Sequence, residues 1–189
     1  MEKEIEARLL EVDVDSFLRK LKENNAEFIG DWLQVRKCYD FNPVRENSWI
    51  RLRTNGEETT LTIKEIENEK IDGTKELEIT VSDFDKTDEI LNKLGYFCRS
   101  NQENRRIRFI LDKVEIDIDF WPKIPTYVEF EAKQKEDIEN LCRKLDIKFE
   151  NLVTLDVSAI YNHYGYDIST FGNIVTLEEE RKNISYNLK

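Results

Sequence analysis

EIEARLL, residues 4–10, lies close to the N-terminus and alternates charged with apolar residues. Its alternate side chains fall into two sets, the charged Glu4, Glu6 and Arg8 and the apolar Ile5, Ala7 and Leu9. A β-strand points successive side chains to opposite faces, so this alternation predicts a strand with one charged and one apolar face. In a strand taken alone, the ordinary explanation is that the charged face meets solvent. The rest of the chain decides whether that explanation holds.

The same alternation recurs in later segments of the chain. The polar positions of these segments are Arg51 and Arg53, Thr62 and Lys64, Glu76, Glu78 and Thr80, Arg106 and Arg108, Glu115, Asp117 and Asp119, and Glu129, Glu131 and Lys133. Acids gather on the first, fifth, seventh and eighth expected strands, and bases gather on the third, fourth and sixth. The charges are therefore sorted by strand.

Two geometries satisfy this pattern. An open sheet would turn its charged face to solvent, whereas a closed sheet would turn it inward and pack its apolar face under helices. Exposed ion pairs contribute only ~0–1 kcal/mol each, so a solvated face gains little from sorting. A buried ionic cavity costs several kcal/mol per unpaired ion and therefore needs mutual pairing, water or a ligand. Bases that match phosphate and acids that match a divalent cation would supply one, but the pattern alone leaves both geometries open.

The order of expected elements is a strand, a helix and three strands, repeated once. Strands are expected near 3–11, 32–41, 48–54, 58–65, 74–81, 103–111, 113–120 and 126–133. Amphipathic helices are expected in 13–26, 83–95, 135–147 and 154–165, and the tail 176–188 forms a fifth helix or stays loosely attached. Eight mostly antiparallel strands are enough to close a barrel, so the fold class is α+β.

Composition narrows the function. The 189 residues carry a net charge of −11 and no long basic run, which argues against binding to nucleic-acid duplexes or anionic membranes. No apolar stretch approaches the ~20 residues of a membrane helix, and no signal peptide is evident. Cys38, Cys98 and Cys142 have neither disulfide nor zinc spacing. They predict reduced thiols in a cytoplasmic protein.

Several of these motifs, in order, resemble the CYTH superfamily of triphosphate tunnel metalloenzymes, which includes class IV adenylate cyclases and thiamine, inorganic and RNA triphosphatases. The ExExK signature of the family is matched by Glu4, Glu6 and Arg8. WIRLR, LTIK, GTKELEI, ENRRIRF, DIDFWPKIPTYVEFEA and DVSAIYNHYG resemble its later motifs. The resemblance covers residues 2–166 and implies an eight-stranded antiparallel tunnel domain at 1–166, with 167–189 as its helical or flexible tail.

The resemblance also implies a site. Triphosphate would bind to Arg8, Arg51, Arg53, Lys64 and Arg106. Mg²⁺ or Mn²⁺ would bind to Glu4, Glu6, Asp119, Glu129 and Glu131. Glu4, Glu6, Arg8, Glu129 and Glu131 would carry catalysis. Glu76 and Glu78 either join the metal site or pair with the bases. Arg108, Glu115 and Asp117 are expected at the rim or in a structural role, and Lys133 at the tunnel mouth.

The implied activity is a metal-dependent triphosphatase that releases orthophosphate from tripolyphosphate or from a nucleoside or thiamine triphosphate. The alternatives are an adenylate cyclase that releases pyrophosphate and a non-catalytic polyphosphate- or nucleotide-binding module. The His-Phe leader of the cyclases is missing before Glu4, which favours hydrolysis. Arg8 in place of the usual lysine replaces a movable point charge with a planar fork, which favours slower chemistry or binding alone. Whether the chain forms a homodimer is left open.

Overall fold

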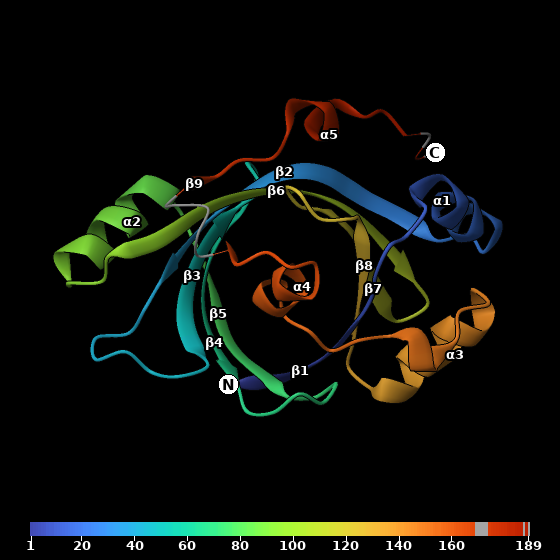
Figure 1. The fold of residues 1–189 in the computed structure, drawn as a ribbon, viewed down its shortest axis with the longest axis horizontal. Coiled ribbons are helices and arrows are strands. Elements are labelled where there is room, and N and C mark those ends of the chain that lie inside the picture. The colour runs from blue at the N-terminus through green and yellow to red at the C-terminus, as the bar shows by residue number, and fades with distance from the viewer. Residues whose placement is uncertain (169–173, 187, 189) are drawn as a thin grey trace.

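Eight antiparallel strands close into a barrel in the computed structural model, which describes residues 1–168, 174–186 and 188 (Figure 1). The strands are β1 (Glu2–Leu9), β2 (Glu27–Tyr39), β3 (Ser48–Thr54), β4 (Thr59–Ile66), β5 (Thr74–Val81), β6 (Cys98–Leu111), β7 (Val114–Phe120) and β8 (Tyr127–Ala132). Their order is β2-β3-β4-β5-β1-β8-β7-β6, and β6 pairs again with β2. The closed α+β architecture expected from the sequence is confirmed.

Two strands begin earlier than the alternation predicts. β2 starts at Glu27 and β6 at Cys98, and the two form one long ladder from Glu27 opposite Ile110 to Tyr39 opposite Cys98. The ladder is irregular between Phe28 and Gly30. A bulge shifts which side chains share a face, so the two-residue period is lost in this region.

The helices are α1 (Val14–Glu23), α2 (Phe84–Lys93), α3 (Lys135–Lys144), α4 (Val157–His163) and α5 (Glu179–Asn183). An aspartate caps three of them, at α1, α2 and α4, by accepting a hydrogen bond from the backbone N–H three residues later. Such caps satisfy an otherwise unpaired donor of the first turn. The helices expected from the sequence are therefore present, each shorter than its expected range, and α3 is shorter only at its C-terminal end.

The apolar core lies outside the barrel. Phe17, Leu18 and Leu21 of α1 and Ile138 and Leu141 of α3 pack against the outward side chains of β6, β7 and β8. In Figure 1 these helices flank the ring of strands on one side, and α2 lies on the other side against β3. Because the helices bury the outward face, the charged face is left to point inward.

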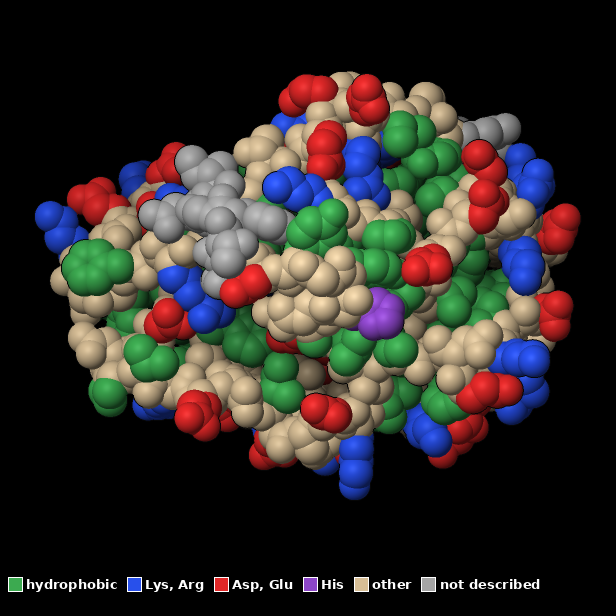
Figure 2. Space-filling model, in the orientation of Figure 1, with side chains coloured by type: hydrophobic (Ala, Val, Ile, Leu, Met, Phe, Trp, Pro, Cys, Tyr) green, Lys and Arg blue, Asp and Glu red, His purple; other side chains and the backbone are tan. Residues whose placement is uncertain are grey.

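Two further segments, α4 and the described part of the chain that follows it, pack on the closed barrel. Helix α4 lies over one end of it, where Ile160 and Tyr161 pack with Trp121, Ile124 and Tyr127 (Figure 1). In Figure 2 the histidine of this helix is exposed, and acidic side chains are visible in the hollow beside it. The short β9 (Ile174–Val175) pairs parallel with β6, and Leu177 is buried. The tail expected at 167–189 thus packs on the domain where it is described, and 169–173, 187 and 189 lie outside the described residues.

Three further observations concern the sequence expectations. Cys38 and Cys142 are buried, Cys98 is half-buried, and all three are free thiols. No described helix has the length and apolar character needed to cross a membrane. The single histidine, His163, ends α4 at the surface.

Candidate functional site

The barrel encloses a cavity of about 1110 Å³, called the tunnel below. The inward side chains that line it are those of the charged alternation. The site residues expected from the sequence line this cavity, except Asp117 and Asp119, which are buried beside Arg108 and Arg106. The strand register therefore brings together side chains that lie up to 127 positions apart, from Glu4 to Glu131.

Three glutamates form an acid row across three neighbouring strands. Glu131 of β8 lies directly opposite Glu6 of β1 on one side and directly opposite Glu115 of β7 on the other. Directly opposed side chains on one sheet face have Cβ atoms about 4.5–5.5 Å apart, and like charges in such pairs are destabilising. The acid row is thus a concentration of negative charge that the fold imposes.

Glu131 is the residue of the acid row whose negative charge is least compensated. No Lys or Arg nitrogen of the described chain lies within 4.0 Å of its carboxylate, whereas Glu6 pairs with Arg8 and Glu115 with Arg108. Burial, followed by the charges of Glu4, Glu129, Glu115 and Glu6, raises the pKa of Glu131 to about 8. A cation bound here would offset that repulsion.

Arg8 is held by groups of the protein. Its guanidinium contacts Glu6 at 2.8 Å and Glu129 at 2.5 Å, and it donates a hydrogen bond of 2.8 Å to the carbonyl of Leu155. Burial opposes its charge, but Glu129 and Glu6 outweigh that effect and raise the pKa of Arg8. Leu155 directly precedes the cap of α4. Through its contacts with Glu6 and Leu155, Arg8 therefore connects the acid row with the helix that covers the end of the barrel.

Arg106 sits among three carboxylates. It donates to both oxygens of Asp119, at 2.9 and 2.5 Å, and contacts Glu129 at 3.1 Å and Asp117 at 2.5 Å. Its neighbour Arg105 points outward instead and binds Asp31. The parity expected for this strand is confirmed, with Arg106 rather than Arg105 facing the tunnel. Arg108 and Asp117 form a two-hydrogen-bond pair beside it.

The opposite wall is basic and consists of Arg51, Arg53 and Lys64 on β3 and β4. Lys64 pairs with Glu76 and, at 3.1 Å, with Glu4, while Arg51 contacts Glu76 and Glu78 at 3.5 and 3.3 Å. Burial would raise the pKa of Glu78, but a hydrogen bond from Thr62 and the charges of Arg51 and Arg53 lower it. Of the two roles left open for Glu76 and Glu78, the geometry is that of pairing with the bases.

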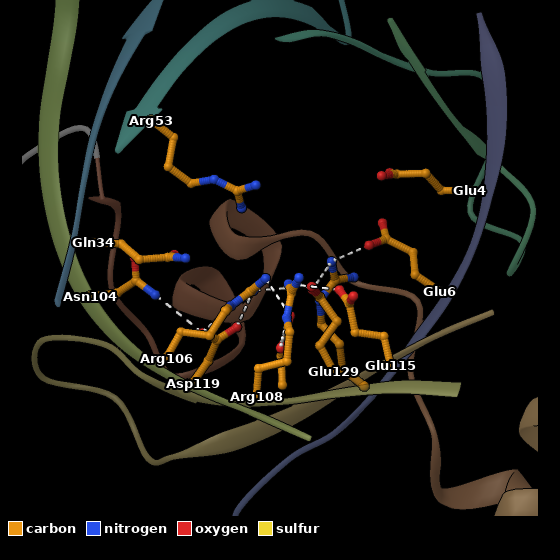
Figure 3. A network of polar contacts seen from close by, with 12 residues as sticks. Glu4, Glu6, Gln34, Arg53, Asn104, Arg106, Arg108, Glu115, Asp119 and Glu129 are labelled. Carbon is orange, nitrogen blue, oxygen red and sulfur yellow. Dashed lines mark hydrogen bonds and ion pairs between the residues drawn. The ribbon is translucent and has the colours of Figure 1, made fainter. Parts of the chain in front are cut away.

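Arg53 is less well paired. Its nearest carboxylate oxygen, on Glu78, is 4.0 Å away. Burial and then the charges of Arg51, Arg106 and Arg36 lower its pKa well below the usual value. Figure 3 shows Arg53 reaching into the tunnel from one side, with Glu4 and Glu6 on the opposite side.

The alternation misses one part of the site, on β2. Gln34 and Arg36 face inward beside Asn104 of β6, and Arg36 lines the tunnel. The alternation of charged and apolar residues is not visible in this part of β2, because the charged Lys37 points outward to Asp88 of α2 and the apolar Cys38 points inward. With a charge outside and a thiol inside, QVRKC does not read as an inverted strand.

A divalent metal fits the donor chemistry of the acid row. Carboxylate oxygens are the ligands that Mg²⁺ and Mn²⁺ prefer, and Glu131 is a carboxylate without a counter-charge. Within the described residues, however, no three His, Cys, Asp or Glu side chains converge on one metal position, because the remaining carboxylates are turned onto Arg8, Arg106 and Lys64. Asp119, expected as a ligand, is saturated by Arg106 and Asn104.

Comparisons with known proteins agree with this fold. The PH1012 protein from Pyrococcus horikoshii OT3 superimposes with a TM-score of 0.70 at 22% identity, over 81% of this chain and 96% of that one. A "putative adenylate cyclase" from Vibrio parahaemolyticus gives 0.72 at 15% identity, over 85% and 98%. A "putative adenylyl cyclase" from Hippeastrum, described as revealing a dominant triphosphatase activity, gives 0.57 at 15% identity, over 89% and 97%.

No curated protein matches the sequence. The model of one family does match, and it spans most of the chain, from residue 2 to residue 158. That range contains all eight barrel strands, every residue of the acid row and the whole basic wall. The chain belongs to the CYTH domain family.

Proposed function

We propose that this protein is a metal-dependent hydrolase that releases orthophosphate from a triphosphate-containing substrate. The observation that carries the proposal is the division of one enclosed cavity into a carboxylate-rich side and a cationic side with incompletely paired arginines. A triphosphate with a bound divalent cation presents both complementary charges. The Hippeastrum protein, which has the same fold, supports hydrolysis as the reaction.

The substrate phosphates would bind to Arg51, Arg53, Lys64 and Arg106. Guanidinium forks match pairs of phosphate oxygens, and their charge stabilises the phosphoryl group during transfer. Because Lys64 and Arg51 are held by Glu4, Glu76 and Glu78, their positions are set before a ligand enters. Arg8 would act from the acidic side, where it holds Glu6 and Glu129 in place.

Mg²⁺ or Mn²⁺ would be held by Glu4, Glu6, Glu129 and Glu131, with Asp119 behind them. When bound, such an ion neutralises phosphate charge and orients the attacking water. The catalytic residues proposed are Glu4, Glu6, Arg8, Glu129 and Glu131, with the carboxylates holding the ion and Arg8 orienting two of them. Glu76, Glu78 and Arg108 would act by fixing their neighbours.

The test is product analysis. The protein is incubated with tripolyphosphate, ATP and thiamine triphosphate under Mg²⁺ or Mn²⁺, and orthophosphate, diphosphates, pyrophosphate and cyclic AMP are resolved. Orthophosphate together with a diphosphate supports the proposal. Cyclic AMP and pyrophosphate from ATP would establish a cyclase instead, and tight binding without turnover would establish a binding module.

A further inference from the structure

Arg36 is a buried arginine that faces the tunnel without a carboxylate. The residue is 6% exposed, and it donates to the side-chain oxygens of Asn104 at 2.8 Å and Gln34 at 3.2 Å. In the described part of the chain no Asp or Glu oxygen lies within 4.0 Å of it, and its Nε has no hydrogen-bond partner. Its hydrogen-bond partners are thus two neutral amides, and it has no ion pair among the described residues.

The position of Arg36 is fixed from behind. Its guanidinium lies over the ring of Trp121, 4.5 Å from the ring centroid, and Trp121 is fully buried against Tyr161 of α4. Asn104 is itself oriented, because its amide nitrogen donates to Asp119 at 3.1 Å. A stacked and hydrogen-bonded guanidinium has little rotamer freedom left to lose on binding a ligand.

A second arginine with little compensation lies directly across from it, since its only carboxylate contact among the described residues is Glu78 at 4.0 Å. Arg36 of β2 is the register partner of Arg53 of β3, so both side chains start from neighbouring points on the inner face. Burial and the charges of Arg51 and Arg106 lower the pKa of Arg36 to about 10. Arg106 and Arg8, by contrast, each contact at least two carboxylates. Two opposed cations, of which one has no ion pair and the other a single one at 4.0 Å, destabilise the fold unless an anion joins them.

We infer that Arg36 and Arg53 together bind the terminal, unesterified phosphate of the substrate. The inference rests on the proposed function and adds to it a residue and a substrate class. A terminal phosphate carries close to two negative charges and three acceptor oxygens at neutral pH, whereas an esterified phosphate carries one charge and two such oxygens. Two guanidinium forks that share a single carboxylate contact, from Arg53 to Glu78 at 4.0 Å, match the former. The organic part of the substrate then lies at the other end of the triphosphate.

The experiment compares ligands that differ only in their chain ends. Binding of tripolyphosphate, ATP and diadenosine triphosphate is measured by isothermal titration with Mn²⁺ present. Diadenosine triphosphate has both ends esterified. We expect the wild-type protein to bind the first two ligands at least tenfold more tightly than the third. Arg36→Gln should weaken tripolyphosphate and ATP by at least tenfold and leave diadenosine triphosphate nearly unchanged. Arg19→Gln, at an exposed arginine of α1, is the control and should change none of them.

Stability separates ligand binding from a structural role. Arg36→Gln removes an unpaired buried cation, so without ligand its melting temperature should equal or exceed that of the wild type. The increase in melting temperature caused by tripolyphosphate should shrink. A ligand-free protein that is markedly less stable would show that Arg36 is structural. Arg36→Lys keeps the charge but loses the fork, and intermediate affinity is expected for it.

The outcomes distinguish this inference from the proposed function. If Arg53→Gln loses tripolyphosphate and Arg36→Gln does not, the inference is wrong and the proposed function stands. If Arg36→Gln weakens all three ligands equally, Arg36 does not recognise the terminal phosphate. If neither variant affects any ligand, the tunnel does not bind triphosphates and both proposals fall.

Discussion

Glu6 and Glu131 are register partners on β1 and β8, two glutamates placed directly opposite each other inside a closed barrel. Arg8, two residues along β1, compensates Glu6 but not Glu131. Since Glu115 opposes Glu131 from the other side, the repulsion acts on this carboxylate from two strands. Burial, the charges of Glu4 and Glu129, and these two opposed glutamates together raise the pKa of Glu131 to about 8.

Glu131→Gln should make the metal-free protein more stable. The substitution removes one of three opposed negative charges with almost no change in shape. Each unit of pKa shift corresponds to about 1.4 kcal/mol, so the expected gain in the free energy of unfolding is on the order of a few kcal/mol near pH 8. Urea denaturation in the presence of a chelator measures it. Glu23→Gln, at an exposed position of α1, is the control and should leave the midpoint where it is.

The stability of the metal-free wild type should fall as pH rises from about 5 to 8. The folded pKa of Glu131, about 8, lies above the value of about 4.5 for an unperturbed glutamate, so the folded state binds more protons across this window. The stabilisation that comes from protonated Glu131 is fully present below the unfolded pKa. It is lost as the pH rises through the folded pKa. Glu129 and Glu78 have lowered pKa values and titrate below the window, whereas the raised pKa values of Glu115 and Asp119 add to the same trend. Melting temperatures at several pH values should show a slope that Glu131→Gln reduces; an equal slope in both proteins would assign it to other groups.

The two sides of the tunnel should bind different parts of the ligand, the acidic side the metal ion and the basic side the triphosphate. Glu131→Gln is expected to weaken Mn²⁺ binding and abolish most turnover while tripolyphosphate still binds, and excess Mn²⁺ should restore part of the activity. Arg53→Ala should lower tripolyphosphate affinity by roughly 10- to 100-fold, because a charged hydrogen bond contributes about 1.5–3 kcal/mol, and metal should not rescue it. Titration of each variant with each ligand is the measurement. Equal losses of both ligands in both variants would contradict the division, and unchanged turnover in both would remove these residues from the site.

Arg8→Met should be the least stable of the variants considered. It leaves Glu6 and Glu129 without their shared cation and removes the hydrogen bond to Leu155. Breaking a buried pair in this way costs about 3–5 kcal/mol. Arg8→Lys should lie between this variant and the wild type, because one ammonium group cannot reproduce the planar fork. Amide hydrogen exchange should show faster opening of α4 in both. Unchanged exchange there would separate Arg8 from the helix.

The two-residue alternation predicted the eight strands and which side chains share a face, and the resemblance to the CYTH superfamily, rather than the pattern alone, predicted that the strands close into a barrel. Arg106, rather than its neighbour Arg105, was assigned to the interior on that basis, and the register agrees. The partners within the tunnel were not predictable. Whether Glu76 binds a metal or Lys64 depends on the pairing of β4 with β5, which no local pattern encodes. Arg36 was not predicted as a site residue, because its neighbour Lys37 is also charged but points outward. There it pairs with Asp88 of α2, a contact that the local sequence does not show.

Helices α1 and α3 cover the outside of the barrel at β6, β7 and β8, but Leu77 and Ile79 on the outer face of β5 are 52% and 56% exposed. The tunnel therefore has a double-layered side, which carries the acid row on β7 and β8, and a single-layered side at β5. Strands with few apolar neighbours open more often than the core of a protein. Local opening of the barrel should therefore occur mainly at β5, where water enters and leaves the tunnel. The carboxylates on the double-layered side should keep their spacing during such opening.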